Sequence, residues 1–178
     1  ARQRIGGRLY TLDDVPGHPE TGGNIIGPNY ARIIDRAKQL GVSLVPATNV
    51  VGGMRNMSLY IDNQFYRPRD WAKAASNPFP AAFKPVPPGS VMSVALGENP
   101  LQGPADWIEP AFAQYDVSAQ PFFEAKGFTN RALELMSHTS GNASVAQTSL
   151  LQLYRSQASF AQARQTKGFP MAVAGGNQ

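Results

Sequence analysis

The chain has 178 residues, of which 42% are hydrophobic and 16% charged, and it contains no cysteine. This length and apolar content suffice for a domain with a real core, and the lack of cysteine excludes disulfides and thiolate metal sites. The formal net charge is +4, but the basic residues beyond the first eight positions are scattered singly and no basic run is interleaved with aromatics. We therefore expect no nucleic-acid partner, and no membrane span, because no apolar run reaches the roughly 18 residues that a spanning helix needs.

The N-terminal stretch combines arginines and glycines at Arg2, Arg4, Gly6, Gly7 and Arg8. Glycine lacks a Cβ, so its backbone can approach a ligand closely or adopt a positive φ. The arginine fork suits a phosphate group. The stretch therefore predicts an anion site, and a solvated, flexible arm is the alternative that the residues leave open.

A second glycine pair, Gly22-Gly23, follows a short strand expected at residues 9–11 and a turn-rich loop at 13–20. A helix is expected next, because Pro28 stands where a helix would begin and Gly41 where it would end. Its apolar residues fall on one face: Ile33, Ile34, Ala37 and Leu40. We expect this face to pack against an apolar surface.

Together the two glycine motifs resemble the flavin-dependent amine oxidase family, which includes the monoamine oxidases and the L-amino-acid oxidases. In that family a Gly-Gly-Arg segment, a strand, a loop, a Gly-Gly turn and a helix ending in Leu-Gly-Val or similar follow one another in this order. Residues 1–42 match the pattern. The family's Gly-x-Gly-x-x-Gly turn and its ribose-binding acid would lie ahead of Ala1, so we expect the chain to be an internal piece of a longer enzyme, inactive by itself.

The resemblance implies an α/β to α+β fold, in which part of an FAD-binding Rossmann-like domain joins a substrate domain of mixed sheet and helices. Residues 1–27 would be a partial FAD-binding segment, and residues 28–170 would form the substrate-binding and helical region. Residues 171–178 would be a strand and a Gly-Gly turn that lead into a C-terminal part.

The resemblance also implies roles for the first motif. Arg8 would pair with the pyrophosphate of FAD, Gly6 and Gly7 would let the backbone approach it, and Arg2 would lie near the adenosine ribose. The alternative for the glycine pair is a plain turn.

For the second motif, the resemblance implies that Gly22, Gly23 and Asn24 run beneath the isoalloxazine ring. Ile25 and Ile26 would then enter the substrate side. Amino-acid-oxidising relatives of the snake-venom type carry an arginine at the position of Ile25, where it grips the substrate carboxylate. The isoleucine therefore favours an amine over an amino acid.

The implied reaction is oxidation of a C–N bond to an imine, which hydrolyses to an aldehyde or ketone, while dioxygen becomes hydrogen peroxide. FAD is the expected cofactor, and a small amine and dioxygen are the expected partners. An L-amino-acid oxidase, a carotenoid or protoporphyrin type of flavin oxidoreductase, and a non-enzymatic phosphate-binding module stay open. A dehydrogenase with another electron acceptor, a homo-oligomer, and a cytoplasmic or exported location also stay open.

The middle of the chain predicts short elements between long loops. Strands are expected over residues 43–51 and 58–66, the second as a hairpin around Asp62 and Asn63. Nine prolines lie between Arg67 and Pro110, which limits helices to short ones at residues 69–76 and near Pro104. We expect this loop-rich segment to pack against parts of the enzyme outside the chain.

The last third is helical in character. Three helices are expected. The first follows Ser118 and runs to Lys126, the second spans residues 131–137 after a cap at Thr129, and the third spans residues 145–163 after a cap at Ser144. Residues 171–174 return as a strand, and Gly175-Gly176 resembles the family's next turn.

No side chains form an evident catalytic set. The two histidines, His18 and His138, show no ligand spacing and are expected at the surface or in structural roles. No Ser-His-Asp or paired-carboxylate arrangement stands out, so no catalytic residue is assigned, as in enzymes whose cofactor carries the hard step. Six aromatic residues could line an amine pocket, although packing in a core is the favoured interpretation for each: Trp71, Trp107, Phe112, Phe122, Phe123 and Tyr154.

Overall fold

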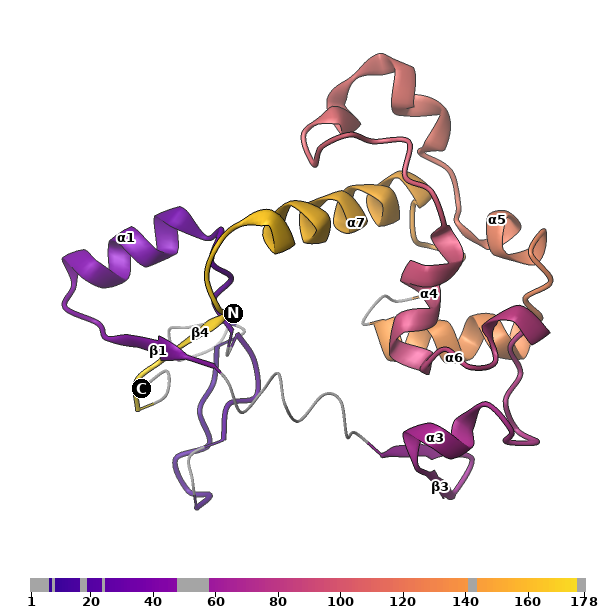
Figure 1. The fold of residues 1–178 in the computed structure, drawn as a ribbon, viewed down its shortest axis with the longest axis horizontal. Helices are drawn as coiled ribbons and strands as arrows, with labels where there is room; N and C mark the ends of the chain where they lie inside the picture. The colour runs from indigo at the N-terminus through magenta and orange to yellow at the C-terminus, as the bar shows by residue number, and fades with distance from the viewer. Residues whose placement is uncertain are drawn as a thin grey trace. The chain divides into compact units, whose positions relative to one another are not determined.

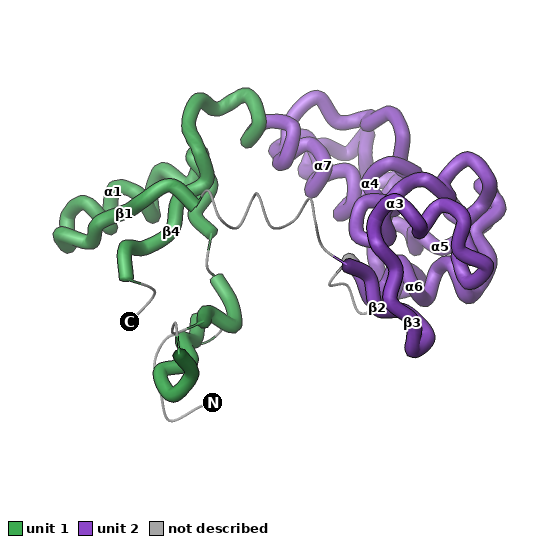
Figure 2. The backbone as a smooth tube through the Cα atoms, turned by 60° about the horizontal axis from the view of Figure 1, so that its bottom comes forward, with its two compact units in different colours: residues 1–55, 163–178 green, residues 56–162 purple. Residues whose placement is uncertain are grey.

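The computed structural model describes residues 7, 9–16, 19–23, 25–47, 58–140 and 144–175 (Figure 1). It contains helices and two small antiparallel sheets, which is an α+β arrangement. The chain divides into two compact units, one made of residues 1–55 and 163–178 and the other of residues 56–162 (Figure 2). The domain boundaries at residues 27 and 170, which came from the family resemblance, stay a prediction.

The first unit contains helix α1 (Ala31–Gln39), whose limits agree with the prediction. Gly41, with φ of +68°, lies just beyond its end, where a left-handed residue commonly terminates a helix. The predicted apolar packing is wrong for the described residues, because none of the side chains of α1 is buried. Ile33 remains 51% exposed, and Leu40, directly after the helix, 64%.

The sheet of the first unit joins strands that are far apart in the sequence. Strand β1 (Leu44–Pro46) pairs antiparallel with β4 (Met171–Val173), with Pro46 opposite Met171. Ile26 forms a further antiparallel bridge to Met171. The two strands confirm the expectations for residues 43–51 and 171–174, although β1 is short and residues 48–51 lie outside the described part.

The second unit begins with a hairpin of strands β2 (Leu59–Ile61) and β3 (Gln64–Tyr66). Asp62 and Asn63 form its two-residue turn with φ of +52° and +60°, the left-handed geometry that matches the twist of the strands. The predicted hairpin is thus confirmed. Leu59, Ile61 and Tyr66 pack against the core of the unit.

The proline-rich middle is more helical than the sequence suggested. It contains α3 (Pro68–Trp71), α4 (Pro88–Leu96) and three short 3₁₀ helices, η1 (Ala81–Phe83), η2 (Asp106–Ile108) and η3 (Pro110–Tyr115). The prediction missed α4 because it took the number of prolines in this segment to limit helices to short ones at residues 69–76 and near Pro104, whereas Pro88 occupies the first turn of α4, where a missing N–H costs nothing. The helix expected over residues 69–76 is shorter, and the one near Pro104 is only a 3₁₀ turn.

Three further helices follow in the chain: α5 (Gln120–Glu124), α6 (Asn130–Ser140) and α7 (Leu150–Gln165), and only residues 163–165 at the end of α7 belong to the first unit. Thr129 Oγ1 accepts a bond from the Ala132 N–H, which confirms the predicted cap of α6. The start of α7 differs from the prediction, because Ser144 caps a separate turn by accepting from the Gln147 N–H. Ser149 takes the cap position of α7 by accepting from the Gln152 N–H.

The core of the second unit is built from these helices and from the loop-rich segment before them. Helix α4 packs on α6, and the rings of Trp71, Phe79, Phe128 and Phe123 follow one another in edge-on or tilted contacts. The expectation that the proline-rich segment packs on parts outside the chain is therefore wrong for Trp71 and Phe79, which are 1% and 2% exposed. Within the described ranges, no helix is long and apolar enough to cross a membrane.

Candidate functional site

The two glycine motifs meet in the first unit because the segments beside them pair with each other. Thr11 and Glu20 form an antiparallel bridge, and the Thr11 hydroxyl donates to Glu20 Oε1 at 2.8 Å. The Thr21 N–H and hydroxyl both donate to the Tyr10 carbonyl, at 2.8 and 2.9 Å. Since antiparallel pairing aligns the start of one segment with the end of the other, Gly7 and Gly22-Gly23 lie toward the same end of this pair.

Two of these glycines adopt the left-handed conformation. Gly7 has φ of +57° and Gly23 has φ of +67°, values at which a side chain is strained. Among the described residues, and apart from its neighbours in the chain, no heavy atom lies within 4 Å of the place a Cβ would take on Gly7, whereas a Cβ on Gly23 would collide with the side chain of Leu9. Gly23 therefore supplies a close contact between the segments that carry the two motifs.

The isoleucines after the second motif are tied to strand β4. The Ile26 N–H donates to the Met171 carbonyl at 2.7 Å, and the Met171 N–H donates back to the Ile26 carbonyl at 2.9 Å. Ile25 and Ile26 are both half-buried, as is Gly22. Strand β4 thus holds the backbone of the apolar segment that follows the glycine turn.

The remaining residues predicted for this site lie outside the described part of the chain: Arg2, Gly6, Arg8 and Asn24. The same holds for His18 and Gly176. The roles that the family resemblance implies for all of the site residues stay predictions.

The six aromatic candidates follow the core interpretation in five cases. Trp71, Phe123 and Tyr154 belong to the buried core, and Phe112 and Phe122 pack against it. Burial, and after it the neighbouring Tyr115, raises the pKa of the Tyr154 phenol, as expected for a packed ring. Trp107 differs, because it is 41% exposed and its ring lies 4.9 Å from the guanidinium carbon of Arg155.

His138 confirms the surface assignment, because its side chain is 72% exposed. Its Nε2 lies 3.7 Å from Glu134 Oε1. Glu134 Oε2 accepts from Arg131 Nη1 at 2.7 Å, and Arg131 Nη2 donates to Asp62 Oδ1 at 2.5 Å. The hydrogen bond from Arg131, followed by the attraction of its charge, lowers the pKa of the Glu134 carboxyl.

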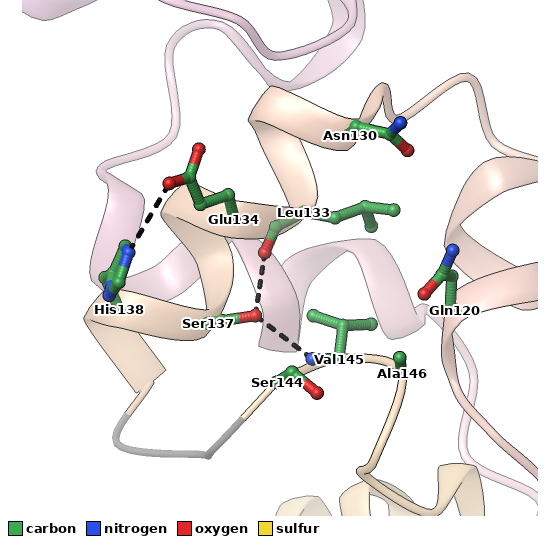
Figure 3. Close-up of a pocket in the computed structure, with 9 residues that line it drawn as sticks. All are labelled: Gln120, Asn130, Leu133, Glu134, Ser137, His138, Ser144, Val145 and Ala146. Carbon is green, nitrogen blue, oxygen red and sulfur yellow. Dashed lines mark hydrogen bonds and ion pairs between the residues drawn. The ribbon is translucent and has the colours of Figure 1, made fainter.

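Sequence reasoning missed a groove in the second unit, next to this ion-pair cluster (Figure 3). The groove has a volume of about 290 Å³ and is bounded by one face of α6, by Gln120 at the start of α5, and by residues 144–146. Asn130, Leu133, Glu134, Ser137 and His138 share that helix face through spacings of three, four, seven and eight residues. This periodicity is visible in the sequence, but the residues that face α6 are not, because tertiary folding places Gln120 and residues 144–146 there.

Among the described residues, no group of three or more histidine, cysteine, aspartate or glutamate side chains could hold a metal ion. Comparison of the chain with models of known protein families and with curated proteins found no match.

Proposed function

We propose that this chain forms part of an FAD-dependent amine oxidase, in which the two glycine turns of the first unit border the cofactor. The observation that carries the proposal is the pairing of residues 10–12 with 19–21, which brings Gly7 and Gly22-Gly23 to one end. A site for a long dinucleotide needs such distant segments to converge. The proposal of this particular family rests on the order of the two glycine motifs in the sequence.

The residues at the site fit a dinucleotide. Gly7 has a positive φ, a conformation that glycine adopts readily, and it has no Cβ that would restrict the approach of a phosphate group to the backbone. Arg8, next in the chain, would hold the pyrophosphate through charge-assisted hydrogen bonds. The chemistry that FAD supplies when bound is two-electron oxidation, with dioxygen as the final acceptor.

The chain's own residues would orient the substrate. Ile25 and Ile26 are half-buried and apolar, and the paired hydrogen bonds to Met171 hold the backbone of Ile26 in place. An apolar wall keeps water from the reacting carbon and favours the neutral form of an amine, since desolvation disfavours the charged form. It offers no cation to a carboxylate, which favours an amine over an amino acid as the substrate.

The test is an absorption spectrum of the full-length protein that carries this sequence, followed by anaerobic addition of amines and amino acids. A flavin spectrum that bleaches with an amine is the expected result. Bleaching only with amino acids would make the protein an L-amino-acid oxidase, and a flavin that neither class bleaches would favour a different flavin oxidoreductase. A colourless protein that cannot be reconstituted with FAD would overturn the proposal and favour a phosphate-binding module.

A matched pair of variants sharpens this test. Gly7→Ala places a methyl group on the backbone at the proposed phosphate contact and is expected to lower the FAD content. Gly41→Ala is the control, because Gly41 also has a positive φ and no described heavy atom beyond its chain neighbours near its Cβ position, but lies after α1. Equal FAD content in the two variants would show that Gly7 matters only for backbone conformation.

A further inference from the structure

The groove on α6 offers a binding site that is separate from the glycine turns, since all of its lining residues belong to the second unit. Its floor is apolar, formed by Leu133 and Val145, which are 6% and 2% exposed. Ser137 does not make the floor polar, because its hydroxyl donates to the Leu133 carbonyl at 2.9 Å and accepts from the Val145 N–H at 3.0 Å. These two bonds also fix residues 144–146 against α6, so the groove is held open by the fold.

The groove carries formal charge of one sign, which is negative. Among the nine residues that line it, Glu134 carries the only formal charge when histidine is neutral. Glu134 Oε2 is committed to Arg131, but Oε1 lies 3.7 Å from His138 Nε2, which exceeds hydrogen-bond distance. Glu134 Oε1 therefore keeps acceptor capacity for a donor from a ligand, and the side chain is a carboxylate at neutral pH, as an ordinary glutamate is.

The other end of the groove is polar but neutral. The carboxamides of Gln120 and Asn130 lie on the far side of Leu133 and Val145 from the pair Glu134 and His138 (Figure 3). Gln120 Nε2 donates to Glu124 Oε1 at 2.7 Å, so this end offers a second polar group the oxygen of Gln120 and the carboxamide of Asn130, which can donate and accept hydrogen bonds.

We propose that this groove binds a small organic amine as its cation. The ammonium group donates to Glu134 Oε1, and the apolar body lies on Leu133 and Val145. A volume of about 290 Å³ is at the lower limit of small-molecule sites, which restricts the ligand to a short chain or a single ring. The site needs no flavin, so it is independent of the proposed oxidase activity.

The test is a titration of the flavin-free 178-residue chain, followed by backbone amide NMR, with pentylamine and pentan-1-ol as probes. The two probes share an apolar body and differ in the charged head group. Pentylamine is expected to bind saturably and to shift the amide signals of α6 and of residues 144–146. Pentan-1-ol is expected to bind at least about tenfold more weakly, because its hydroxyl can donate to the carboxylate but carries no positive charge and lacks the ion-pair attraction.

Two variants test the recognition by charge. Glu134→Gln is expected to reduce pentylamine affinity to that of pentan-1-ol, whereas Glu98→Gln, an exposed acid outside the groove, should leave it unchanged. Asn130→Lys adds a cation to the groove rim while keeping Glu134, and should also weaken the amine but not the alcohol. If Glu134→Gln does not fold, the Asn130→Lys variant tests by itself whether the groove recognises the amine by charge.

Three results would overturn the proposal: no saturable binding of pentylamine to the unaltered chain, equal binding of the alcohol, or full amine affinity in both groove variants. Because the assay contains no flavin, each of these results leaves the proposed oxidase function to its own spectroscopic test.

Discussion

Gly23 lies against the side chain of Leu9, so closely that a Cβ on Gly23 would overlap the leucine. The contact joins the segment after the first glycine motif to the second motif. Position 23 requires glycine for two reasons: its φ is +67°, and the contact with Leu9 leaves no room for a side chain. Gly23 therefore serves both the backbone conformation and the packing against Leu9.

Gly23→Ala is expected to loosen the pairing of residues 10–12 with 19–21. The substitution costs about 1 kcal/mol for the left-handed backbone, with a further cost for displacing Leu9. Amide hydrogen exchange at Leu12 and Thr21, whose N–H groups donate across the pair, should become faster. The measurement is exchange monitored by NMR.

Leu9→Ala separates the two costs. In its background, Gly23→Ala should lose the steric part of its effect and retain only the backbone part, as in a double-mutant cycle. An identical effect of Gly23→Ala with leucine or alanine at position 9 would contradict the packing account.

The elements that the sequence predicted well are those whose signals are local. The turn at Asp62 and Asn63 uses residue types that tolerate positive φ, and both residues adopt it. Helix α1 lies between Pro28 and Gly41, where helix starts and stops are expected. Such signals depend on a few neighbouring residues and need no tertiary partner.

The elements that were misjudged depend on tertiary packing. No helix was predicted at Pro88, but this residue begins α4, which buries Val91 and Ala95 in the core. Ser144 is a residue type that often caps helices, but here it caps a turn that precedes α7. Val145 in this turn is buried in the core. The groove on α6 was missed for the same reason, because long-range folding brings Gln120 opposite α6.

Asn77 is a buried polar residue that holds the loop between α3 and η1. Its amide donates to the carbonyls of Trp71 and Lys84, each at 3.0 Å, and its Oδ1 accepts from the Phe79 N–H at 3.1 Å. Asn77→Ala leaves these backbone groups without their partner and should cost on the order of 2–3 kcal/mol of unfolding free energy. Urea unfolding followed by tryptophan fluorescence measures the loss, and an effect as small as that of Asn29→Ala, at an exposed position, would contradict it.

Phe123 and Phe160 provide a matched comparison of burial. Phe123 is fully buried and contacts Phe128 and Phe122, whereas Phe160, on α7, is 68% exposed. Phe123→Ala is expected to cost about 3–5 kcal/mol, because it removes apolar contact and leaves a cavity. Phe160→Ala should change the unfolding free energy by less than about 1 kcal/mol, and similar losses for both variants would show that α7 is covered in solution.

Glu134 gives the fold a pH dependence whose sign follows from its partner. The Arg131 hydrogen bond lowers the pKa of Glu134 in the folded chain below the ordinary value of about 4.3. The carboxylate therefore contributes stability above that ordinary value, and the contribution is lost as the pH falls through the lower, folded pKa. The difference in unfolding free energy between the unaltered chain and Glu134→Gln should shrink over that acidic range and be constant above it.

The side-chain carboxyl signal of Glu134, followed by NMR during an acid titration, measures the same pKa directly. Arg131→Gln should return the pKa to the ordinary glutamate range, because it removes the hydrogen bond and the charge together. Lys73→Gln is the control. Lys73 forms no ion pair with Glu134 in the structure, so its replacement should leave the pKa of Glu134 unchanged. A Glu134 pKa that does not move in Arg131→Gln would show that the ion pair does not form in solution, and the groove would then present both carboxylate oxygens to a ligand.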